Sequence, residues 1–253
     1  MHYTGQVYRP PTEANTPLLE VTAGCSYNRC AFCTMYDRTE FSISPEDNII
    51  SDLRELSVIK DRINRIYLLN GDPFVLPAEK LLRIAELIHE YLPKVSLITC
   101  YASIRDIKNK SFEDIQKLRE AGMDYIAIIM NGIADREKSQ EHVEATVRLL
   151  NETQPAGVGP MSTSVSPGSE LEALRNQGIY TELTEGEILE EEIALLEGLE
   201  LDPQAFWFGS HIFNNVSVSG IFKQKDEMLA RLKAGLEAMS EEERSSIRDR
   251  GHI

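Results

Sequence analysis

The 253-residue sequence has little of several features that would assign it to a class of protein directly. Cysteine occurs four times and histidine five times, and aromatic residues make up 7% of the chain. So few cysteines in so long a chain do not suit the disulfide framework of a small secreted domain, and we expect reduced thiols and a cytoplasmic location. No apolar run is long enough to cross a bilayer and no basic-then-apolar leader opens the sequence, so we expect no membrane segment.

Positive charge is also scarce. Lysine and arginine number 26 against 41 acidic residues, which gives a formal net charge of −15. A large nucleic-acid interface needs a basic face for phosphate contacts, so we expect a small molecule or a protein as the partner and no nucleic acid. Hydrophobic and charged residues, at 42% and 26%, are in the proportions of an ordinary globular protein that can bury one substantial core.

The most informative stretch is a group of three cysteines near the start. Cys25, Cys30 and Cys33 are spaced C-x4-C-x2-C and follow a short apolar segment that ends in Gly24. Three thiolates on one short loop can converge on a single point, and such a group prefers a soft metal or an iron–sulfur cluster. Three protein ligands on a four-iron cluster would leave one iron open to a further ligand.

Other readings of these cysteines stay open at this point. A structural zinc ion wants four ligands, usually from two close pairs, whereas Cys100 and the five histidines are scattered along the chain. A disulfide pair or ordinary buried thiols would also account for the cysteines. Cys100 itself suits a small buried hydrophobe, with a thiol near the substrate as the functional alternative.

Strand-like and helix-like segments alternate along the chain. Short apolar runs predict buried parallel strands, and apolar positions at helical spacing predict helices between them. We expect strands at 18–21, 65–70, 95–100, 125–130, 158–165 and 205–210, and helices at 45–58, 77–91, 111–121, 136–151, 185–199 and 226–239. This alternation is typical of parallel βαβ units in a barrel or an open α/β sheet. We expect one domain over residues 1–253, with 1–16 as an extended N-terminal arm.

Polar and small residues follow several of the predicted strands. The first strand leads to the cysteines, the second to Gly71-Asp72, and the third to Cys100 with Tyr101 and Ser103. In (β/α) barrels the loops at the carboxyl ends of the strands converge on one face, so these residues are candidates for a common site. The Gly71-Asp72 pair also has an ordinary turn reading, because glycine and aspartate often end strands.

The cysteine loop resembles that of the radical S-adenosylmethionine (radical SAM) superfamily. Phe32, between the last two cysteines, matches the aromatic residue that packs beside the cofactor's adenine in that family. The commonest spacing there is C-x3-C-x2-C, and longer first gaps resemble subgroups near the methylthiotransferases, the elongator catalytic subunit and the oxygen-independent coproporphyrinogen oxidases. The resemblance implies a partial (β/α) TIM-like barrel.

Two further segments carry the resemblance. Asn70-Gly71-Asp72-Pro73 resembles the Gly-Gly-Glu-Pro-like turn that binds the SAM amino group, with aspartate for glutamate. Asn131-Gly132 resembles the turn after the family's fifth strand, where the backbone contacts adenine. The family's Glu-Ser-Gly-like motif has no counterpart between Gly122 and Gly132, as though one βα unit near Ile126 were absent. The resemblance thus implies Phe32, Gly71, Asp72, Asn131 and Gly132 as cofactor-binding residues.

The resemblance also implies an activity. Cys25, Cys30 and Cys33 would hold a [4Fe–4S] cluster that binds SAM, and reductive cleavage of SAM would yield a 5′-deoxyadenosyl radical that abstracts hydrogen from an unidentified substrate. An electron donor such as flavodoxin or ferredoxin would be needed. The alternatives are a non-catalytic [4Fe–4S] or electron-transfer protein on a degenerate barrel, and a zinc module completed by Cys100 or His211. No residue is singled out as catalytic, and His211 is more often structural than catalytic.

Overall fold

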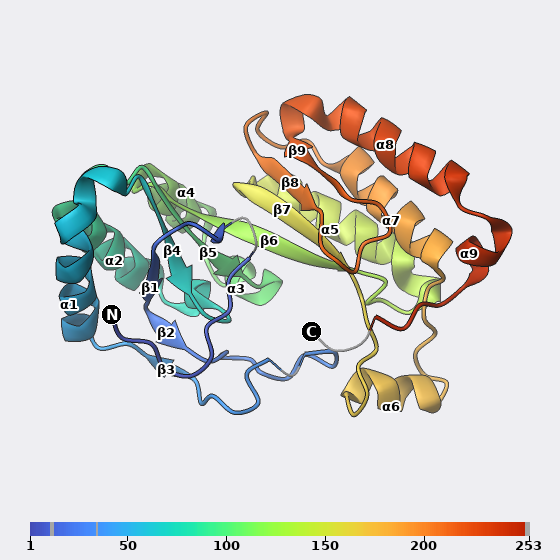
Figure 1. The fold of residues 1–253 in the computed structure, drawn as a ribbon, viewed down its shortest axis with the longest axis horizontal. Coiled ribbons are helices and arrows are strands. Elements are labelled where there is room, and N and C mark those ends of the chain that lie inside the picture. Colours follow the sequence, from blue (N-terminus) through green and yellow to red (C-terminus); the bar gives the residue numbers. More distant parts are fainter. Residues whose placement is uncertain (11–12, 34, 251–253) are drawn as a thin grey trace. The chain divides into compact units, whose positions relative to one another are not determined.

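The computed structural model describes residues 1–10, 13–33 and 35–250. Contacts between Cα atoms divide the chain into two compact units, residues 1–29 with 35–127 and residues 30–34 with 128–253. Strand β6 (Met123–Asn131) crosses from the first unit into the second. Each unit combines β-strands with α-helices (Figure 1).

Seven strands of the described chain form one sheet in the order β1-β4-β5-β6-β7-β8-β9. The pairs β1–β4, β4–β5, β5–β6 and β7–β8 are parallel, whereas β8 and β9 pair in antiparallel fashion. The order of the described strands ends at β1 and at β9, so they do not close into a full barrel. The predicted α/β class, a partial barrel of mostly parallel strands with alternating helices, is confirmed.

The first unit contains the amino-terminal strands. The strands are β1 (Leu18–Glu20), β4 (Arg65–Leu69) and β5 (Leu97–Ala102), and the helices are α1 (Glu46–Leu56), α2 (Ala78–Tyr91), α3 (Ile104–Lys108) and α4 (Phe112–Glu120). Helix α2 follows Pro77 and buries Leu81, Ile84 and Ile88, which recur at helical spacing. A two-stranded antiparallel hairpin, β2 (Thr22–Ala23) with β3 (Ser42–Ile43), brackets the cysteine region in sequence.

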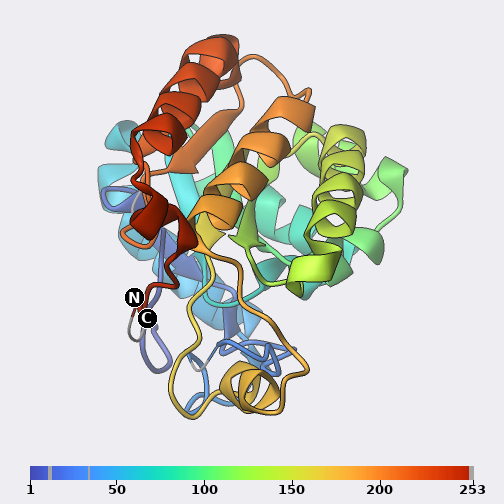
Figure 2. The ribbon, with the colours of Figure 1, turned by 90° about the vertical axis from the view of Figure 1, so that its right-hand side faces the viewer.

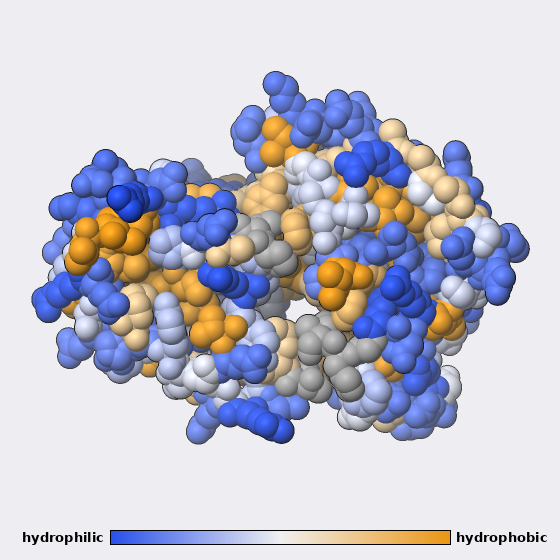
Figure 3. Space-filling model, viewed as in Figure 1, coloured by the Kyte–Doolittle hydropathy of each residue, from blue (hydrophilic) through white to orange (hydrophobic). Residues whose placement is uncertain are grey.

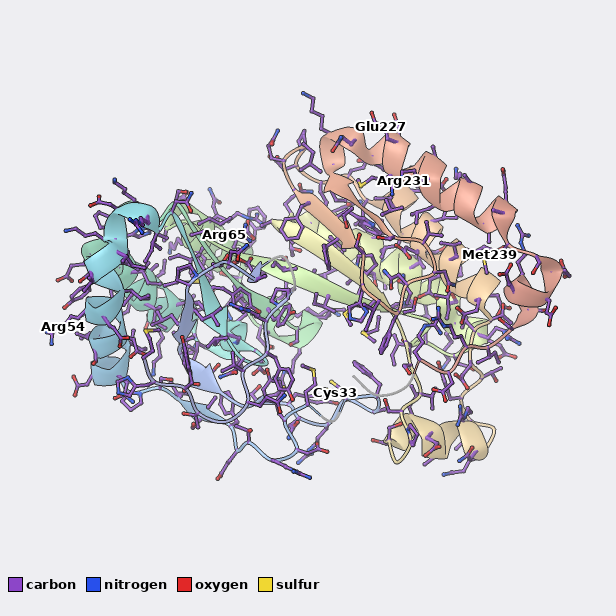
Figure 4. All side chains as sticks on the ribbon, viewed as in Figure 1. Cys33, Arg54, Arg65, Glu227, Arg231 and Met239 are labelled. Carbon is purple, nitrogen blue, oxygen red and sulfur yellow. The ribbon has the colours of Figure 1, made fainter. Side chains whose placement is uncertain are left out.

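The N-terminal arm is tied to the first unit by a buried ion pair. Glu13 has no exposed side-chain surface, and its carboxylate pairs with Arg65 of β4 (labelled in Figure 4). The hydroxyl of Thr99 on β5 donates to the same carboxylate oxygen at 3.0 Å. The arm was predicted only as extended chain, and this contact holds it against two neighbouring strands.

The second unit contains the remaining strands and helices. The strands are β7 (Gly157–Ser162), β8 (Phe206–Gly209) and β9 (Val218–Ile221), and the helices are α5 (Ser139–Thr153), α6 (Glu170–Asn176), α7 (Glu185–Gly198), α8 (Lys225–Ala238) and α9 (Glu241–Ser245). Helices α5, α7 and α8 lie side by side, with α7 packed against both of the others (Figure 2). A capping box at Thr184 and Glu187 begins α7.

The sequence predictions agree with most of these elements to within about three residues. The antiparallel strand β9, the hairpin β2–β3 and the short helices α3, α6 and α9 were not predicted. These segments have two to seven residues, too few for an apolar period to be recognised. Strand β5 pairs directly with β6, and the seven-stranded sheet has β7 next, so Asn131 ends the fourth strand of that sheet and Gly132 follows it.

The visible surface is mainly hydrophilic in both units (Figure 3). Large exposed apolar side chains include Val58 and Phe112 in the first unit and Ile179 and Ile212 in the second. None of the described helices is both long and apolar enough to span a membrane.

Candidate functional site

Cys25 lies in the first unit, beside the turn that follows β4. The side chain is half-buried, and the preceding residue, Gly24, accepts a hydrogen bond from the backbone N–H of Gly71 at 3.1 Å. A Cβ atom on Gly71 would lie 2.7 Å from the Cβ of Cys25 and 2.9 Å from the ring of Tyr36. Only glycine permits this approach, so Gly71 is required by the packing of the first cysteine against the strand end.

Asp72 connects the end of β4 to the residue that follows Cys25. The carboxylate is 2% exposed and accepts the backbone N–H of Ser26 at 3.0 Å, and it also binds the Ser26 hydroxyl. Burial raises the pKa of Asp72 above its ordinary value, and the hydrogen bonds from Ser26 partly oppose that shift. The predicted site residue Asp72 is therefore engaged with the cysteine loop of its own unit.

Arg105 at the start of α3 completes this network. One guanidinium nitrogen donates to the Ser26 hydroxyl at 2.6 Å and lies 3.5 Å from the Asp72 carboxylate, while Nε donates to Asp106 at 3.2 Å. The guanidinium also stacks over the ring of Tyr27, 5.1 Å from its centroid. Sequence reasoning missed Arg105 and Ser26, because nothing in the spacing of residues 26, 72 and 105 shows that they meet.

Cys30 and Cys33 belong to the second unit. Cys30 is exposed and Cys33 (labelled in Figure 4) is half-buried, and the N–H of Cys33 donates to the carbonyl of Cys30 at 3.0 Å in a tight turn. Ala31, within that turn, accepts the backbone N–H of Leu171 in α6 at 2.9 Å. The start of α6 therefore holds the segment that carries the second and third cysteines.

The three thiols suit an iron–sulfur cluster in kind, because cysteine thiolates are the usual ligands of such clusters. Phe32, between two of the cysteines, is half-buried. Among the described residues, no group of three or more His, Cys, Asp and Glu side chains is arranged to hold a metal ion.

Asn131 is the last residue of β6, in the second unit, and its side chain lies in an unusual environment. The residue is fully buried, and neither polar atom of its amide has a hydrogen-bond partner among the described residues. Its backbone carbonyl accepts the N–H of Thr163 at 2.8 Å, and the hydroxyl of Thr163, just after β7, is likewise without a described partner. Buried polar atoms normally have partners, so these side chains have unused hydrogen-bonding capacity at the ends of β6 and β7.

Gly132 next to it is fully engaged by the protein. Its φ angle is +81°, its N–H donates to Glu191 of α7 at 2.9 Å, and its carbonyl accepts the hydroxyl of Tyr180 at 2.7 Å. The positive φ explains the glycine. Because its N–H is already used, the group at this turn with unused hydrogen-bonding capacity is the side chain of Asn131.

The loop after β8 is held by Asn214. Its amide oxygen accepts the N–H of Ser162 at 2.9 Å and its amide nitrogen donates to the carbonyl of Gly209 at 3.1 Å, which joins the ends of β7 and β8. His211 in the same loop accepts the N–H of Phe213 through Nδ1 at 3.3 Å, and burial lowers its pKa. The lowered pKa favours the neutral form of His211 near pH 7, in which Nδ1 can accept this hydrogen bond.

Cys100 lies within β5 and has no exposed surface. Burial raises the pKa of its thiol well above the ordinary value, which keeps the sulfur protonated and unreactive at neutral pH. The environment of Cys100 is that of a small buried hydrophobe.

Comparison with known proteins identifies a family. The model of the radical SAM superfamily matches residues 19–168, more than half of the chain. No curated protein matches the sequence.

Solved structures with some similarity include two enzymes. The FeFe-hydrogenase maturase HydG from Carboxydothermus hydrogenoformans is 14% identical, with a TM-score of 0.42 over 86% of this chain and 56% of that one. Methylornithine synthase (PylB) is 14% identical, with a TM-score of 0.38 over 74% of this chain and 63% of that one. The chain thus spans less than two thirds of either protein.

Proposed function

Because the chain belongs to the radical SAM superfamily, we propose that it is an enzyme that cleaves S-adenosylmethionine reductively and abstracts hydrogen from a substrate. The observation that carries this proposal is the family match over residues 19–168, which includes the three cysteines and the turns after β4 and β6. When bound, a [4Fe–4S] cluster and SAM supply the one-electron cleavage to methionine and a 5′-deoxyadenosyl radical. The protein's part is to bind, orient and exclude water.

Cys25, Cys30 and Cys33 are the proposed cluster ligands. The contacts of Asp72 with Ser26 support a positioning role for this carboxylate, since they restrain the chain next to Cys25. The bond from Leu171 to Ala31 similarly restrains the turn that joins Cys30 to Cys33. Thiol ligands held by such contacts lose less conformational freedom when the cluster binds.

The proposed SAM-binding residues are Phe32, Gly71, Asp72, Asn131 and Gly132. The buried, unpartnered amide of Asn131 supports a direct hydrogen bond to the polar edge of the nucleoside. Gly71 and Gly132 contribute through their backbone, Gly71 by close approach to Cys25 and Gly132 by its positive φ. Phe32 offers an aromatic face for the adenine ring.

The substrate is a small molecule or a protein side chain, and the electron donor is a flavodoxin- or ferredoxin-type protein in the cytoplasm. The net charge of −15 supports the choice of substrate class, because it disfavours a nucleic acid.

A second candidate is a cluster-binding or electron-transfer protein that does not turn over SAM. The lack of a Glu-Ser-Gly-like segment between Gly122 and Gly132 favours it, because the family uses that segment to bind the cofactor.

Anaerobic reconstitution separates these functions. The protein is loaded with iron and sulfide, its iron, sulfide and zinc contents are measured, and 5′-deoxyadenosine is assayed after addition of SAM and dithionite. The proposed enzyme binds about four irons per chain and forms 5′-deoxyadenosine. Iron and sulfide without that product would support the electron-transfer protein, and zinc without iron would overturn both.

A further inference from the structure

The turn that presents Asn131 is held from one side by a single buried carboxylate. Glu191 of α7 is 4% exposed, yet both of its oxygens are used. One oxygen accepts the N–H of Gly132 at 2.9 Å and lies 3.2 Å from Nδ1 of His142, and the other binds the hydroxyl of Ser139. A buried carboxylate is stable only with such partners, and here every partner lies in the segment that follows β6.

Tyr180 binds the same turn at the other backbone polar group of Gly132, its carbonyl. Its hydroxyl donates to the carbonyl of Gly132 at 2.7 Å in a buried contact. Glu191 thus accepts from the N–H of Gly132, 59 positions away in sequence, and Tyr180 donates to the carbonyl of the same residue, 48 positions away. With its φ at +81°, Gly132 would otherwise be free to sample other backbone conformations.

The turn is also fixed on the side of the sheet. The carbonyl of Asn131 accepts the N–H of Thr163 at 2.8 Å, which ties the end of β6 to the end of β7. The backbone on either side of the Asn131 side chain is therefore hydrogen-bonded, whereas the side-chain amide itself has no described partner. The turn is thus tied by hydrogen bonds on both sides of one buried side-chain amide that has hydrogen-bonding capacity left.

We infer that Glu191 and Tyr180 are positioning residues, which set the conformation of the Asn131-Gly132 turn so that the Asn131 amide meets the nucleoside part of SAM. The inference rests on the proposed function, because it assumes that SAM is the ligand. Neither residue touches the cofactor, and their effect on its affinity passes through the backbone of Gly132. A small displacement of a positioned group is enough to weaken binding strongly.

Three substitutions at the turn and two controls elsewhere separate loss of these hydrogen bonds from general loss of stability. Glu191→Ala removes the acceptor for Gly132, and Tyr180→Phe removes only the donor to its carbonyl. Glu191→Gln is the conservative variant, because its amide oxygen can still accept from Gly132. Glu190→Ala removes the exposed neighbouring carboxylate, and Leu232→Ala in the buried part of α8 destabilises the same unit without touching the turn.

The test combines two measurements on the reconstituted, oxidised protein under anaerobic conditions. Calorimetry gives the Kd for SAM, and hydrogen exchange reports protection of the peptide that contains Gly132. We expect Glu191→Ala and Tyr180→Phe to raise the Kd by about tenfold and to speed exchange at the turn. Glu191→Gln, Glu190→Ala and Leu232→Ala should keep the wild-type Kd at a temperature where all variants are folded.

An unchanged Kd in Glu191→Ala and Tyr180→Phe, with wild-type protein that binds SAM, would overturn the inference alone. An equal rise in Leu232→Ala would also overturn it, because general destabilisation would then explain the loss. Wild-type protein that binds no SAM would overturn the proposed function and the cofactor role together. In that case the exchange data still decide whether Glu191 and Tyr180 hold the turn.

Discussion

The carboxylate of Asp72, in the turn after β4, accepts the backbone N–H of Ser26 at 3.0 Å and so holds the residue that follows the first cysteine. The two lie 46 positions apart, and the contact is part-buried. It couples the conformation of the Cys25 loop to the turn after β4.

Replacing Asp72 tests this coupling. Asp72→Ala leaves the N–H of Ser26 without its acceptor and removes one of the two carboxylates near Arg105, at a cost of roughly 1–3 kcal/mol in unfolding free energy. We expect a lower iron content after reconstitution as well, and a smaller loss for Asp72→Asn, whose oxygen can still accept from Ser26. Urea unfolding and iron analysis measure both effects. Asp61→Ala, which removes an exposed carboxylate of the same unit, is the control, and an equal effect there would contradict the coupling.

The cysteines are expected to differ in their effect on the cluster. Alanine at Cys25, Cys30 or Cys33 should abolish the brown colour and the iron–sulfur absorption of reconstituted protein. Cys100→Ala should retain both, because its thiol is fully buried within β5 and stays protonated. Bleaching in Cys100→Ala would show that the ligand set has been assigned wrongly.

Replacing Asn131 by leucine should weaken SAM binding without lowering the stability of the protein. Its buried amide lacks described partners, which costs roughly 1–3 kcal/mol in the free protein. The nearly isosteric change Asn131→Leu removes that cost, so we expect a melting temperature equal to or above that of the wild type. The Kd for SAM should rise by about tenfold. A large loss of stability would instead show that the amide has a structural partner.

Glu192 should make the stability of the second unit depend on pH. The side chain is 1% exposed on α7, one of its oxygens has no described partner, and burial raises its pKa from 4.5 to about 8. Between these values the folded state binds more protons than the unfolded state, so the unfolding free energy falls as pH rises, by up to about 1.4 kcal/mol per pH unit.

The corresponding experiment is urea unfolding at pH 5, 6, 7 and 8. Glu192→Gln should remove most of the decline, because its side chain does not titrate, and should be more stable than the wild type at pH 8. Glu190→Gln, an exposed neighbour, should keep the wild-type slope. Parallel profiles for the wild type and Glu192→Gln would refute a buried, protonated Glu192.

The N-terminal arm should contribute strongly to the stability of the first unit. Glu13→Ala leaves Arg65 with an uncompensated charge that is 30% exposed, and leaves the hydroxyl of Thr99 without its acceptor. Loss of one partner of a buried pair costs about 3–5 kcal/mol, and the partial exposure of Arg65 places the expected loss at the low end. Restoring hydrogen bonding with Glu13→Gln should recover part of it in urea unfolding. No change in Glu13→Ala would mean that the arm is not docked in solution.

The sequence was sufficient for the alternation of elements and for the type of chemistry. Continuous apolar runs such as 65–69 and helical spacing such as that of Leu81, Ile84 and Ile88 are local signals, and they predicted the parallel α/β sheet. The C-x4-C-x2-C spacing is equally local, and it indicated the superfamily that the family model then matched. Short elements such as β9 and α3 were not predicted, because contacts with neighbouring elements stabilise them and their own apolar residues form no recognisable period.

Only the tertiary structure decided how the site residues are held. Asp72 with Ser26, Glu13 with Arg65, and Glu191 with Gly132 are partners 46, 52 and 59 positions apart. Hydrogen bonds between such residues leave no periodic trace in the chain, because they depend on which strand ends and helix faces the fold brings together. The residue types that can bind a cluster and a nucleoside can thus be recognised in the sequence, whereas the contacts that orient them form only when the chain folds.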